Sequence, residues 1–347
     1  MTKIRLLNPK KYPRHEQVYS FEDKAVGLRG YIAIHNTSLG PATGGTRLYP
    51  YNNDAEALED VLKLSEAMTY KCAFAGLPFG GGKAVIMASP QQKTKELLKS
   101  YAKVIHFFGG KYTTGTDVGI SDEDAKYMST LTPFILRGTR GRTSTSLVAA
   151  RGVYESITAS FRELLPKKKL SAMTIAIKGA GKIGAELIRL LYSREARITI
   201  AEINPAILSK IKKLFPKIKT ADYKNIHKLK ADIFSPCAMG GDLNKKTIKE
   251  LGCRIIAGGA NNQLEDEKDI VSMHRQGVWY IPDYVANAGG LIQIVDELRK
   301  GGYKSERVKK NIKNIGRSTT RLIQESKRTG LPPLEIAGNI VRARMQQ

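Results

Sequence analysis

The chain contains 347 residues, a length that predicts two domains, each with a core of its own. Apolar residues make up 41% of it and charged residues 26%, so the composition excludes an intrinsically disordered chain. No apolar stretch approaches the roughly 20 residues that a membrane-spanning helix needs. Because the N-terminus lacks the apolar core of a signal peptide and the three cysteines are scattered, we expect a cytoplasmic protein.

The net charge of +25 raises the question of nucleic-acid binding. The basic residues are spread along the chain, and neither an aromatic RNA-binding motif nor a zinc-finger spacing accompanies them. We therefore expect no specific nucleic-acid partner and no membrane partner, but loose, salt-sensitive adhesion to polyanions. The alternative, a nucleic-acid-binding protein, predicts association that persists above moderate salt.

Residues 1–140 are expected to form the first, α/β domain. Residues 30–36 read as a strand, and Asn53 as the N-cap of a helix whose apolar residues recur at helical spacing up to Met68. That helix carries Lys71 near its C-terminal end.

A glycine-rich loop at 80–82 is expected to enter a strand at Lys83. The elements expected after it are a helix over about 91–107, a short strand around Tyr112 and the segment Thr-Asp-Val-Gly at 116–119.

A second domain is expected over residues 147–320, after a Gly/Arg/Ser/Thr linker at 138–146. A helix near 148–165 precedes a series of strands, each followed by a loop or helix, which predicts a parallel sheet with helices on both faces. The expected strands are 173–177, 197–201, 231–236, 254–262 and 278–284, and basic amphipathic helices follow residue 291.

A Gly-x-Gly-x-x-Gly motif follows the first strand of this second domain and opens an apolar helix. In that context Gly179 permits a tight turn, Gly181 lets the backbone approach a pyrophosphate, and Gly184 lets the helix pack close to the sheet. Glu202, eighteen residues past Gly184, can accept both ribose hydroxyls, and its charge would repel a 2′-phosphate. The motif therefore predicts NAD rather than NADP, with Lys182 as a possible phosphate contact or a solvent-exposed side chain.

Two lysines in the first domain have the chemistry of an amino acid site. Lys71 can neutralise a substrate carboxylate, and Lys83, close to a second amine and enclosed by glycine-rich backbone, is the candidate base. Asp117 is the candidate proton partner of the substrate amine or of a water molecule. None of the five histidines lies in a motif, which disfavours a 2-hydroxy acid dehydrogenase.

Several motifs, in this order, resemble those of the Glu/Leu/Phe/Val dehydrogenase family, the amino acid dehydrogenases, with the leucine type as the closest resemblance. They are Gly-Pro-Ala-Thr-Gly-Gly-Thr-Arg (40–47), Met-Thr-Tyr-Lys (68–71), Gly-Gly-Gly-Lys (80–83), Thr-Asp-Val-Gly (116–119), the glycine motif (179–184), Ala-Gly-Gly-Ala-Asn-Asn-Gln (257–263) and Pro-Asp-Tyr-Val-Ala-Asn-Ala-Gly-Gly (282–290).

The resemblance implies an N-terminal α/β substrate-binding and oligomerisation domain, a Rossmann-like NAD-binding domain, a cleft between them, and C-terminal helices (321–347) that return to the first domain. It implies that Lys71 and Asn261 bind the substrate carboxylate, that Gly44 and Gly45 shape the pocket, and that Lys83 and Asp117 are catalytic. The cofactor contacts expected are Gly179, Gly181, Lys182, Ile183, Gly184, Glu202, Ala238, Asn261 and Asn287, and no metal ligand is expected.

The same resemblance points to the substrate side chain. Glutamate enzymes of the family carry a lysine where this chain has Thr43, so a glutamate side chain would be left unpaired at a cost of several kcal/mol. Leu291 and Ile294 would line an apolar pocket, and Gly115 would leave space on the other wall. We therefore expect a branched-chain or other apolar L-amino acid, with an aromatic one (phenylalanine or tryptophan) as the alternative.

One departure from the family pattern concerns Ala149, which takes the place of a threonine that contacts the nicotinamide amide. Thr145 is a possible substitute donor. Ala149 is the one feature that favours a further alternative, a catalytically weakened nucleotide-binding homologue. The C-terminus is short compared with the octameric leucine type, so a homodimer is expected rather than an octamer.

Overall fold

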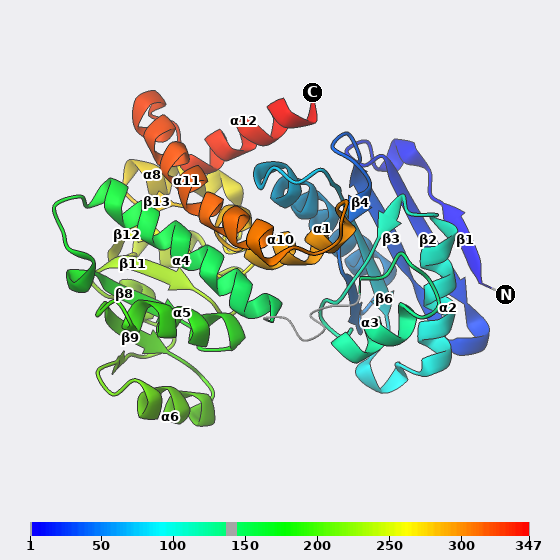
Figure 1. Cartoon of the computed structure of the whole chain (residues 1–347), viewed down its shortest axis with the longest axis horizontal. Coiled ribbons are helices and arrows are strands. Elements are labelled where there is room, and N and C mark those ends of the chain that lie inside the picture. Colours follow the sequence, from blue (N-terminus) through cyan, green and yellow to red (C-terminus); the bar gives the residue numbers. More distant parts are fainter. Residues whose placement is uncertain (1, 137–143, 347) are drawn as a thin grey trace. The chain divides into compact units, whose positions relative to one another are not determined.

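The computed structural model describes residues 2–136 and 144–346 (Figure 1). The chain divides into two compact units, which we describe separately. Unit 1 comprises Met1–Arg142 and Val341–Gln347, and unit 2 comprises Thr143–Ile340. Part of the expected linker at 138–146 lies outside the described residues, and the helix after it already begins at Thr145.

Unit 1 is built on a mixed seven-stranded sheet of order β1-β2-β3-β6-β4-β7, with β5 paired to β6. The pairs β1–β2, β2–β3 and β3–β6 are antiparallel, whereas β4 and β5 run parallel to β6, and β7 runs parallel to β4. The strands are β1 (Lys3–Leu6), β2 (Gln17–Asp23), β3 (Leu28–Asn36), β4 (Ala42–Thr43), β5 (Thr46–Tyr49), β6 (Gly80–Met87) and β7 (Tyr112–Thr113).

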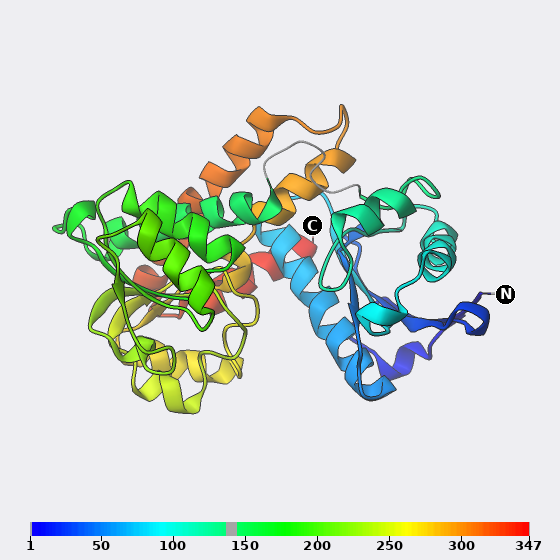
Figure 2. The same ribbon diagram turned by 90° about the horizontal axis from the view of Figure 1, so that it is seen from below.

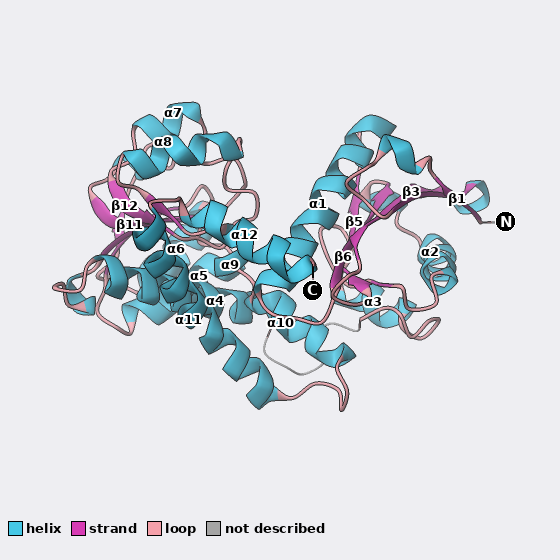
Figure 3. Ribbon diagram, turned by 90° about the horizontal axis from the view of Figure 1, so that it is seen from above, coloured by secondary structure: helices cyan, strands magenta, loops and turns pink. Residues whose placement is uncertain are grey.

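Helices cover both faces of this sheet: α1 (Asp54–Phe74) lies on one face, and α2 (Lys95–Phe107) and α3 (Asp122–Met128) lie on the other (Figures 2 and 3). The side chain of Asn53 accepts a hydrogen bond from the amide of Glu56, as its expected N-cap role requires. The second helix begins at Lys95 rather than near 91, because Pro90 opens a separate short turn and Thr94 caps the helix.

The triple glycine is not a loop, as the sequence suggested, but the first part of strand β6. A Cβ on Gly81 would overlap the backbone of Thr69 in α1, and one on Gly82 would lie 2.8 Å from the ring of Tyr112. The glycines therefore allow α1 and Tyr112 to approach the strand from its two faces, and Lys83 is held within a regular strand.

Unit 2 contains an entirely parallel six-stranded sheet of order β10-β9-β8-β11-β12-β13. This order is that of a dinucleotide-binding Rossmann sheet, which confirms the fold predicted for the second half of the chain. Its strands are β8 (Thr174–Lys178), β9 (Arg197–Ala201), β10 (Lys219–Thr220), β11 (Ala231–Pro236), β12 (Cys253–Ile256) and β13 (Trp279–Tyr280).

The last two strands are shorter than the expected 254–262 and 278–284, because glycine-rich and Asn-rich segments follow β12 and because Asp283 starts a helical turn after β13. The sequence analysis missed β10 and α6. The helices of unit 2 are α4 (Thr145–Leu164), α5 (Lys182–Tyr192), α6 (Pro205–Leu214), α7 (Lys245–Lys249), α8 (Ile270–Arg275), α9 (Asp283–Ala286), α10 (Gly289–Val295), α11 (Ser305–Thr329) and α12 (Pro333–Met345).

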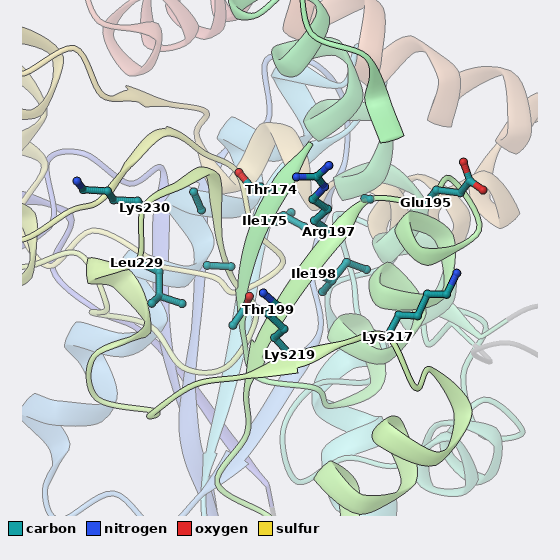
Figure 4. Close-up of a pocket in the computed structure, with 13 residues that line it drawn as sticks. Thr174, Ile175, Glu195, Arg197, Ile198, Thr199, Lys217, Lys219, Leu229 and Lys230 are labelled. Atoms are coloured by element: carbon teal, nitrogen blue, oxygen red, sulfur yellow. The ribbon is translucent and has the colours of Figure 1, made fainter. Parts of the chain in front are cut away.

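Helices α5 and α6 lie on one face of the parallel sheet, and α7 and α8 lie on the other, over β11 to β13 (Figure 3). A pocket of about 430 Å³ lies at the starts of β8 and β9 (Figure 4). Four exposed cations line it, and none of them forms an ion pair with a described residue: Arg197, Lys217, Lys219 and Lys230.

The C-terminal helices differ from the expected segment 321–347. Residue 321 lies in the middle of α11, and only the residues from Val341 onward cluster with unit 1. There, Arg344 donates hydrogen bonds to the carbonyl oxygens of Ala73 and Phe74 at the end of α1. Among the described residues, no helix is long and apolar enough to span a membrane.

Candidate active site

Lys83 and Asp117 form a buried ion pair in unit 1. The Lys83 side chain, on β6, is 8% exposed and that of Asp117 is 21% exposed, and the Lys83 amine contacts Oδ2 of Asp117. The other oxygen, Oδ1, accepts a hydrogen bond of 2.8 Å from the amide of Val118. Burial alone would raise the pKa of Asp117, but the charges of Lys83 and Arg47 outweigh it and hold the pKa below its ordinary value. Asp117 is therefore a carboxylate at neutral pH.

Gly44 and Gly45 pack against the two segments that carry Lys83 and Asp117. A Cβ on Gly44 would overlap the carbonyl oxygen of Gly82, and one on Gly45 would overlap that of Thr116 and lie 3.1 Å from Cβ of Asp117. Both positions therefore require glycine for close backbone packing. The segments 40–47, 80–83 and 116–119, far apart in the sequence, meet at one place in unit 1.

Lys71 belongs to the same part of unit 1. It lies one turn beyond Met68 in α1, and the Met68 side chain packs 3.1 Å from the space that a Cβ of Gly44 would occupy. Lys71 is half-exposed in the last turn of the helix. The helix C-terminus, rich in carbonyl oxygens, favours a cation there.

Two of the four residues expected to decide the substrate side chain, Thr43 and Gly115, also lie in unit 1. Thr43, on β4, is 1% exposed, and its hydroxyl accepts a hydrogen bond of 3.2 Å from that of Thr113 on β7. The described atoms nearest to a Cβ at Gly115 belong to Leu136, the first at an ordinary contact distance of 3.5 Å. A small residue at 115 therefore leaves space beside Leu136, and the fold does not require it.

Arg47, Asp60 and Tyr51 extend the charged cluster, and the sequence analysis assigned them no role. Arg47 Nε lies 3.7 Å from Oδ2 of Asp117, and its Nη1 lies 2.8 Å from Oδ2 of Asp60. The Tyr51 hydroxyl donates a 2.5 Å hydrogen bond to the same oxygen of Asp60. Arg47 closes the first quoted motif, but only the fold brings Asp60 to it.

In unit 2 the glycine motif has the geometry of a phosphate-binding turn. Gly179 has a positive φ of 92° and packs against Ala238, and a Cβ on Gly184 would overlap the carbonyl of Gly179. At Gly181, the N-cap of α5, a Cβ would meet nothing within 4 Å. No described residue fills that space, so the opening at the helix N-terminus fits the pyrophosphate of a dinucleotide. Lys182 is exposed beside it, and Ile183 packs on Gly259.

Glu202 lies at the end of β9, as expected, and is joined to the glycine turn. Its carboxylate accepts hydrogen bonds from the amides of Ala180, at 2.6 Å, and Asn204, at 2.9 Å. A second acid that the sequence analysis missed, Asp242, forms a 2.5 Å ion pair with Lys178, the residue directly before the motif. Glu202 thus places a carboxylate at the end of β9, whereas the charge of Asp242 is paired with that of Lys178.

The remaining polar candidates are Asn261, in the loop after β12, and Asn287, at the C-terminal end of α9. Asn287 is 6% exposed and donates a 2.9 Å hydrogen bond to Oδ1 of the exposed Asn261. The Oδ1 atom of Asn287 is buried and has no hydrogen-bond partner among residues 2–136 and 144–346, so it can accept a bond from a bound ligand.

Leu291 and Ile294 lie one turn apart on α10, and both are half-buried. Ala149 packs in α4 against Gly289 and Gly290, at the start of the same helix. The structure therefore holds Asn261, Asn287, Leu291 and Ile294 in unit 2, and the lysines in unit 1. Within residues 2–136 and 144–346, no cluster of three metal-ligating side chains occurs.

Two family models match the chain. The model described as Glu/Leu/Phe/Val dehydrogenase, dimerisation domain, matches residues 15–133. The model described as Glutamate/Leucine/Phenylalanine/Valine dehydrogenase matches residues 199–344. Together they span most of both units.

Individual relatives act on different amino acids. The chain is 40% identical to a phenylalanine dehydrogenase of Lysinibacillus sphaericus (91% of this chain, 84% of the relative) and 36% identical to a leucine dehydrogenase of Bacillus subtilis (96% and 92%). The crystal structure of L-tryptophan dehydrogenase from Nostoc punctiforme superimposes with a TM-score of 0.83 at 36% identity, covering 97% of each chain.

Proposed function

Because this chain belongs to the Glu/Leu/Phe/Val dehydrogenase family, and is an amino acid dehydrogenase that uses a nicotinamide cofactor, we propose that it deaminates an apolar L-amino acid oxidatively and reversibly. The products are the 2-oxo acid and ammonia. The observation that carries the proposal is the buried Lys83–Asp117 pair, which lies on the glycine segments that also contact the helix of Lys71.

The chemistry assigns a task to each of these side chains. Lys71 pairs with the substrate carboxylate, with help from Asn261. A bound nicotinamide would supply the acceptor for the hydride of Cα. Lys83 removes a proton from the water that attacks the resulting imine, and Asp117 exchanges protons with Lys83 and the amine. The buried position of Lys83 keeps its amine from competing contacts with bulk water.

The residues proposed to hold the cofactor are those of the glycine turn and its neighbours. The turn at Gly179, Gly181 and Gly184, with Lys182 and Ile183, carries the pyrophosphate at the N-terminus of α5. Ala238 and Asn287 contact the cofactor farther along the sheet edge. Glu202 binds the ribose hydroxyls, which favours NAD over NADP. A Glu202→Gln variant should accept NADP better relative to NAD by about tenfold, the effect of removing roughly 1.4 kcal/mol of charge repulsion.

The apolar character of the substrate rests on three side chains. Thr43 offers no charge to a substrate carboxylate and is buried against Thr113. Leu291 and Ile294 present a bulky apolar face on α10. We propose a branched-chain amino acid first. The space beside Gly115, and the tryptophan and phenylalanine dehydrogenases among the relatives, support an aromatic one as the second candidate.

A substrate panel tests the proposal. NADH formation is followed at alkaline pH with leucine, isoleucine, valine, phenylalanine, tryptophan and glutamate. Turnover of apolar residues without glutamate is expected. Turnover of glutamate alone would overturn the substrate class. NAD binding with no turnover of any of the six would point to a weakened homologue, in which Ala149 has replaced a needed donor.

The assembly and location follow from the same assignment. We propose a cytoplasmic homodimer or higher homo-oligomer without a specific nucleic-acid partner. The first family model, that of a dimerisation domain, supports the self-association. Light scattering measures the assembly. Retention on immobilised DNA, followed as salt rises, should be lost by moderate ionic strength because only unspecific cation–phosphate contacts are expected.

A further inference from the structure

Four side chains of alternating charge contact one another in a row that begins with the candidate base. In order they are Lys83 on β6, Asp117, Arg47 on β5 and Asp60 on α1. Lys83 and Arg47 both approach the same oxygen of Asp117, Arg47 at 3.7 Å. Arg47 in turn donates to both oxygens of Asp60, at 3.1 and 2.8 Å.

The backbone around Asp117 is held without help from Arg47's side chain. The amide of Thr46 donates to the carbonyl of Gly115 at 3.0 Å, and the amide of Leu48 donates to that of Val118 at 2.8 Å. The Val118 amide also binds Oδ1 of Asp117. The Arg47 side chain therefore acts on Oδ2 of Asp117, the atom that contacts Lys83. It fixes the direction of this oxygen and places a positive charge beside it.

Arg47 and Asp60 carry opposite charges and therefore have opposite effects on the affinity of the Lys83–Asp117 pair for protons. Arg47 is the second cation that holds the pKa of Asp117 down. Asp60 neutralises part of the Arg47 charge from the far side and is itself fixed by the Tyr51 hydroxyl. The further titratable group that faces Asp117 is Tyr112 on β7, whose pKa burial raises well above its ordinary value, so that it stays neutral.

We propose that Arg47, anchored by Asp60, is a positioning residue that fixes Asp117 against Lys83 and sets the pH at which the pair works. This inference rests on the proposed function, and it adds two residues to the machinery that act through Asp117 rather than on the substrate.

The test is the pH profile of kcat/KM for Arg47→Gln and Asp60→Asn. Without the Arg47 charge, Lys83 and Asp117 bind their protons more tightly. The midpoint of the acid limb of the kcat/KM profile should therefore move to higher pH in Arg47→Gln. Removing the anion should move it to lower pH in Asp60→Asn. The shift is expected to be about one pH unit in Arg47→Gln, whose charge lies 3.7 Å from Asp117, and smaller in Asp60→Asn, whose charge acts from beyond Arg47. In Arg47→Gln, kcat should fall about a hundredfold through misplacement of Asp117, with KM changed less than about threefold.

The chain contains a matched control. Arg29, Asp54 and Tyr31 form the same arrangement at the start of α1, with Arg29 Nη2 3.0 Å from Asp54 and the Tyr31 hydroxyl bonded to that carboxylate. Arg29→Gln and Asp54→Asn make the same chemical changes in the same unit. They should leave the midpoint within about 0.2 pH units, because exposed pairs are screened. Arg47→Lys, which restores the charge, should return the midpoint toward that of the wild type.

Midpoints that stay fixed, or that move in the same direction in both variants, would overturn the proposal, as would equal shifts in the control pair. A wild type that turns over no amino acid would instead contradict the proposed function. In that case the carboxyl carbon of Asp117 is titrated by NMR, with its signal assigned by its loss in Asp117→Asn. A pKa that does not rise in Arg47→Gln would then overturn the role of Arg47.

Discussion

The hydroxyl of Thr113 donates a hydrogen bond to that of Thr43, and both side chains are buried on adjacent parallel strands of unit 1. This bond satisfies two polar groups without any charge. An unpaired ammonium at either position would lose several kcal/mol of hydration. Thr43 therefore offers no charge to the substrate side chain that the proposed function places beside it.

Replacing Thr43 by lysine should reverse this preference. In Thr43→Lys, kcat/KM for the best apolar amino acid should fall at least about tenfold, and glutamate should become a substrate, since its side chain can pair with the buried amine. Glutamate should also raise the melting temperature of the variant but not of the wild type. Ser38→Lys adds the same charge at an exposed site and should do neither. A variant that still rejects glutamate would remove Thr43 from the specificity site.

Removing the amine of Lys83 should abolish turnover without disturbing the cofactor. In Lys83→Ala we expect kcat to fall by about 10²–10⁴-fold, the usual contribution of a general base, while NAD binding stays within about twofold. Asp117 keeps Arg47 as a partner, so the fold should survive. NADH formation and NAD fluorescence titration measure the two effects. Lys168→Ala, which breaks the 2.6 Å ion pair with Asp232, is the control. Near-normal turnover in Lys83→Ala would contradict the role of Lys83.

Two glycines of the nucleotide turn should respond differently to the same change. Gly181→Ala places a methyl group in open space, so the melting temperature should stay within about 2 °C, while NAD binds at least about tenfold more weakly. Gly184→Ala forces a methyl group into the carbonyl of Gly179 and should destabilise unit 2 by about 1–3 kcal/mol. Thermal unfolding and NAD titration separate the two. Equal NAD affinity in Gly181→Ala and the wild type would contradict the proposed phosphate site.

His35 should make the protein less stable as the pH falls from about 6.5. Burial, with smaller effects of His15 and Arg14, lowers its pKa to about 4 from an ordinary 6.5. Between these values the unfolded chain binds a proton that the folded chain does not, so acidification favours unfolding, by at most about 3 kcal/mol. Urea unfolding at pH 7 and pH 4.5 measures the loss.

The matched variants are His35→Gln and His106→Gln. The first removes the buried ring that bonds to Thr69, and it should flatten the dependence of stability on pH. The second removes an exposed ring and should leave the slope unchanged. Parallel slopes in all three proteins would show that other groups cause the acid sensitivity.

The parts of the fold that the sequence predicted are those with a strong local signal. The glycine turn, the N-cap Asn53 and the apolar strands 197–201 and 231–236 each carry their own pattern, and the structure has them at those positions. The prediction of a loop at Gly80–Gly82 was wrong, because three glycines in a row usually indicate a loop. Here they are in a strand, since α1 and Tyr112 pack against it, and only tertiary contacts decide that.

The candidate site shows the same division. Lys83 and Asp117 could be chosen from their motifs, and the structure pairs them. Asp60 could not, because it looks like any solvated acid on an amphipathic helix until Arg47 is placed beside it. Lys178 and Asp242 are 64 positions apart, and no sequence period relates them.

The bonds from Arg344 to the last carbonyls of α1 have a consequence for how the protein is made. The last carbonyls of the helix that carries Lys71 are bound by Arg344. This arginine leaves the ribosome some 270 residues after the end of the helix. Most of unit 1 emerges early, yet its lysine-bearing helix gains this cap only after nearly all of unit 2 has been synthesised. Nascent chains that stall before Arg344 should therefore have the complete sheet of unit 1 but a frayed C-terminal end of α1. A bulky C-terminal fusion should weaken amino acid binding before it weakens nucleotide binding.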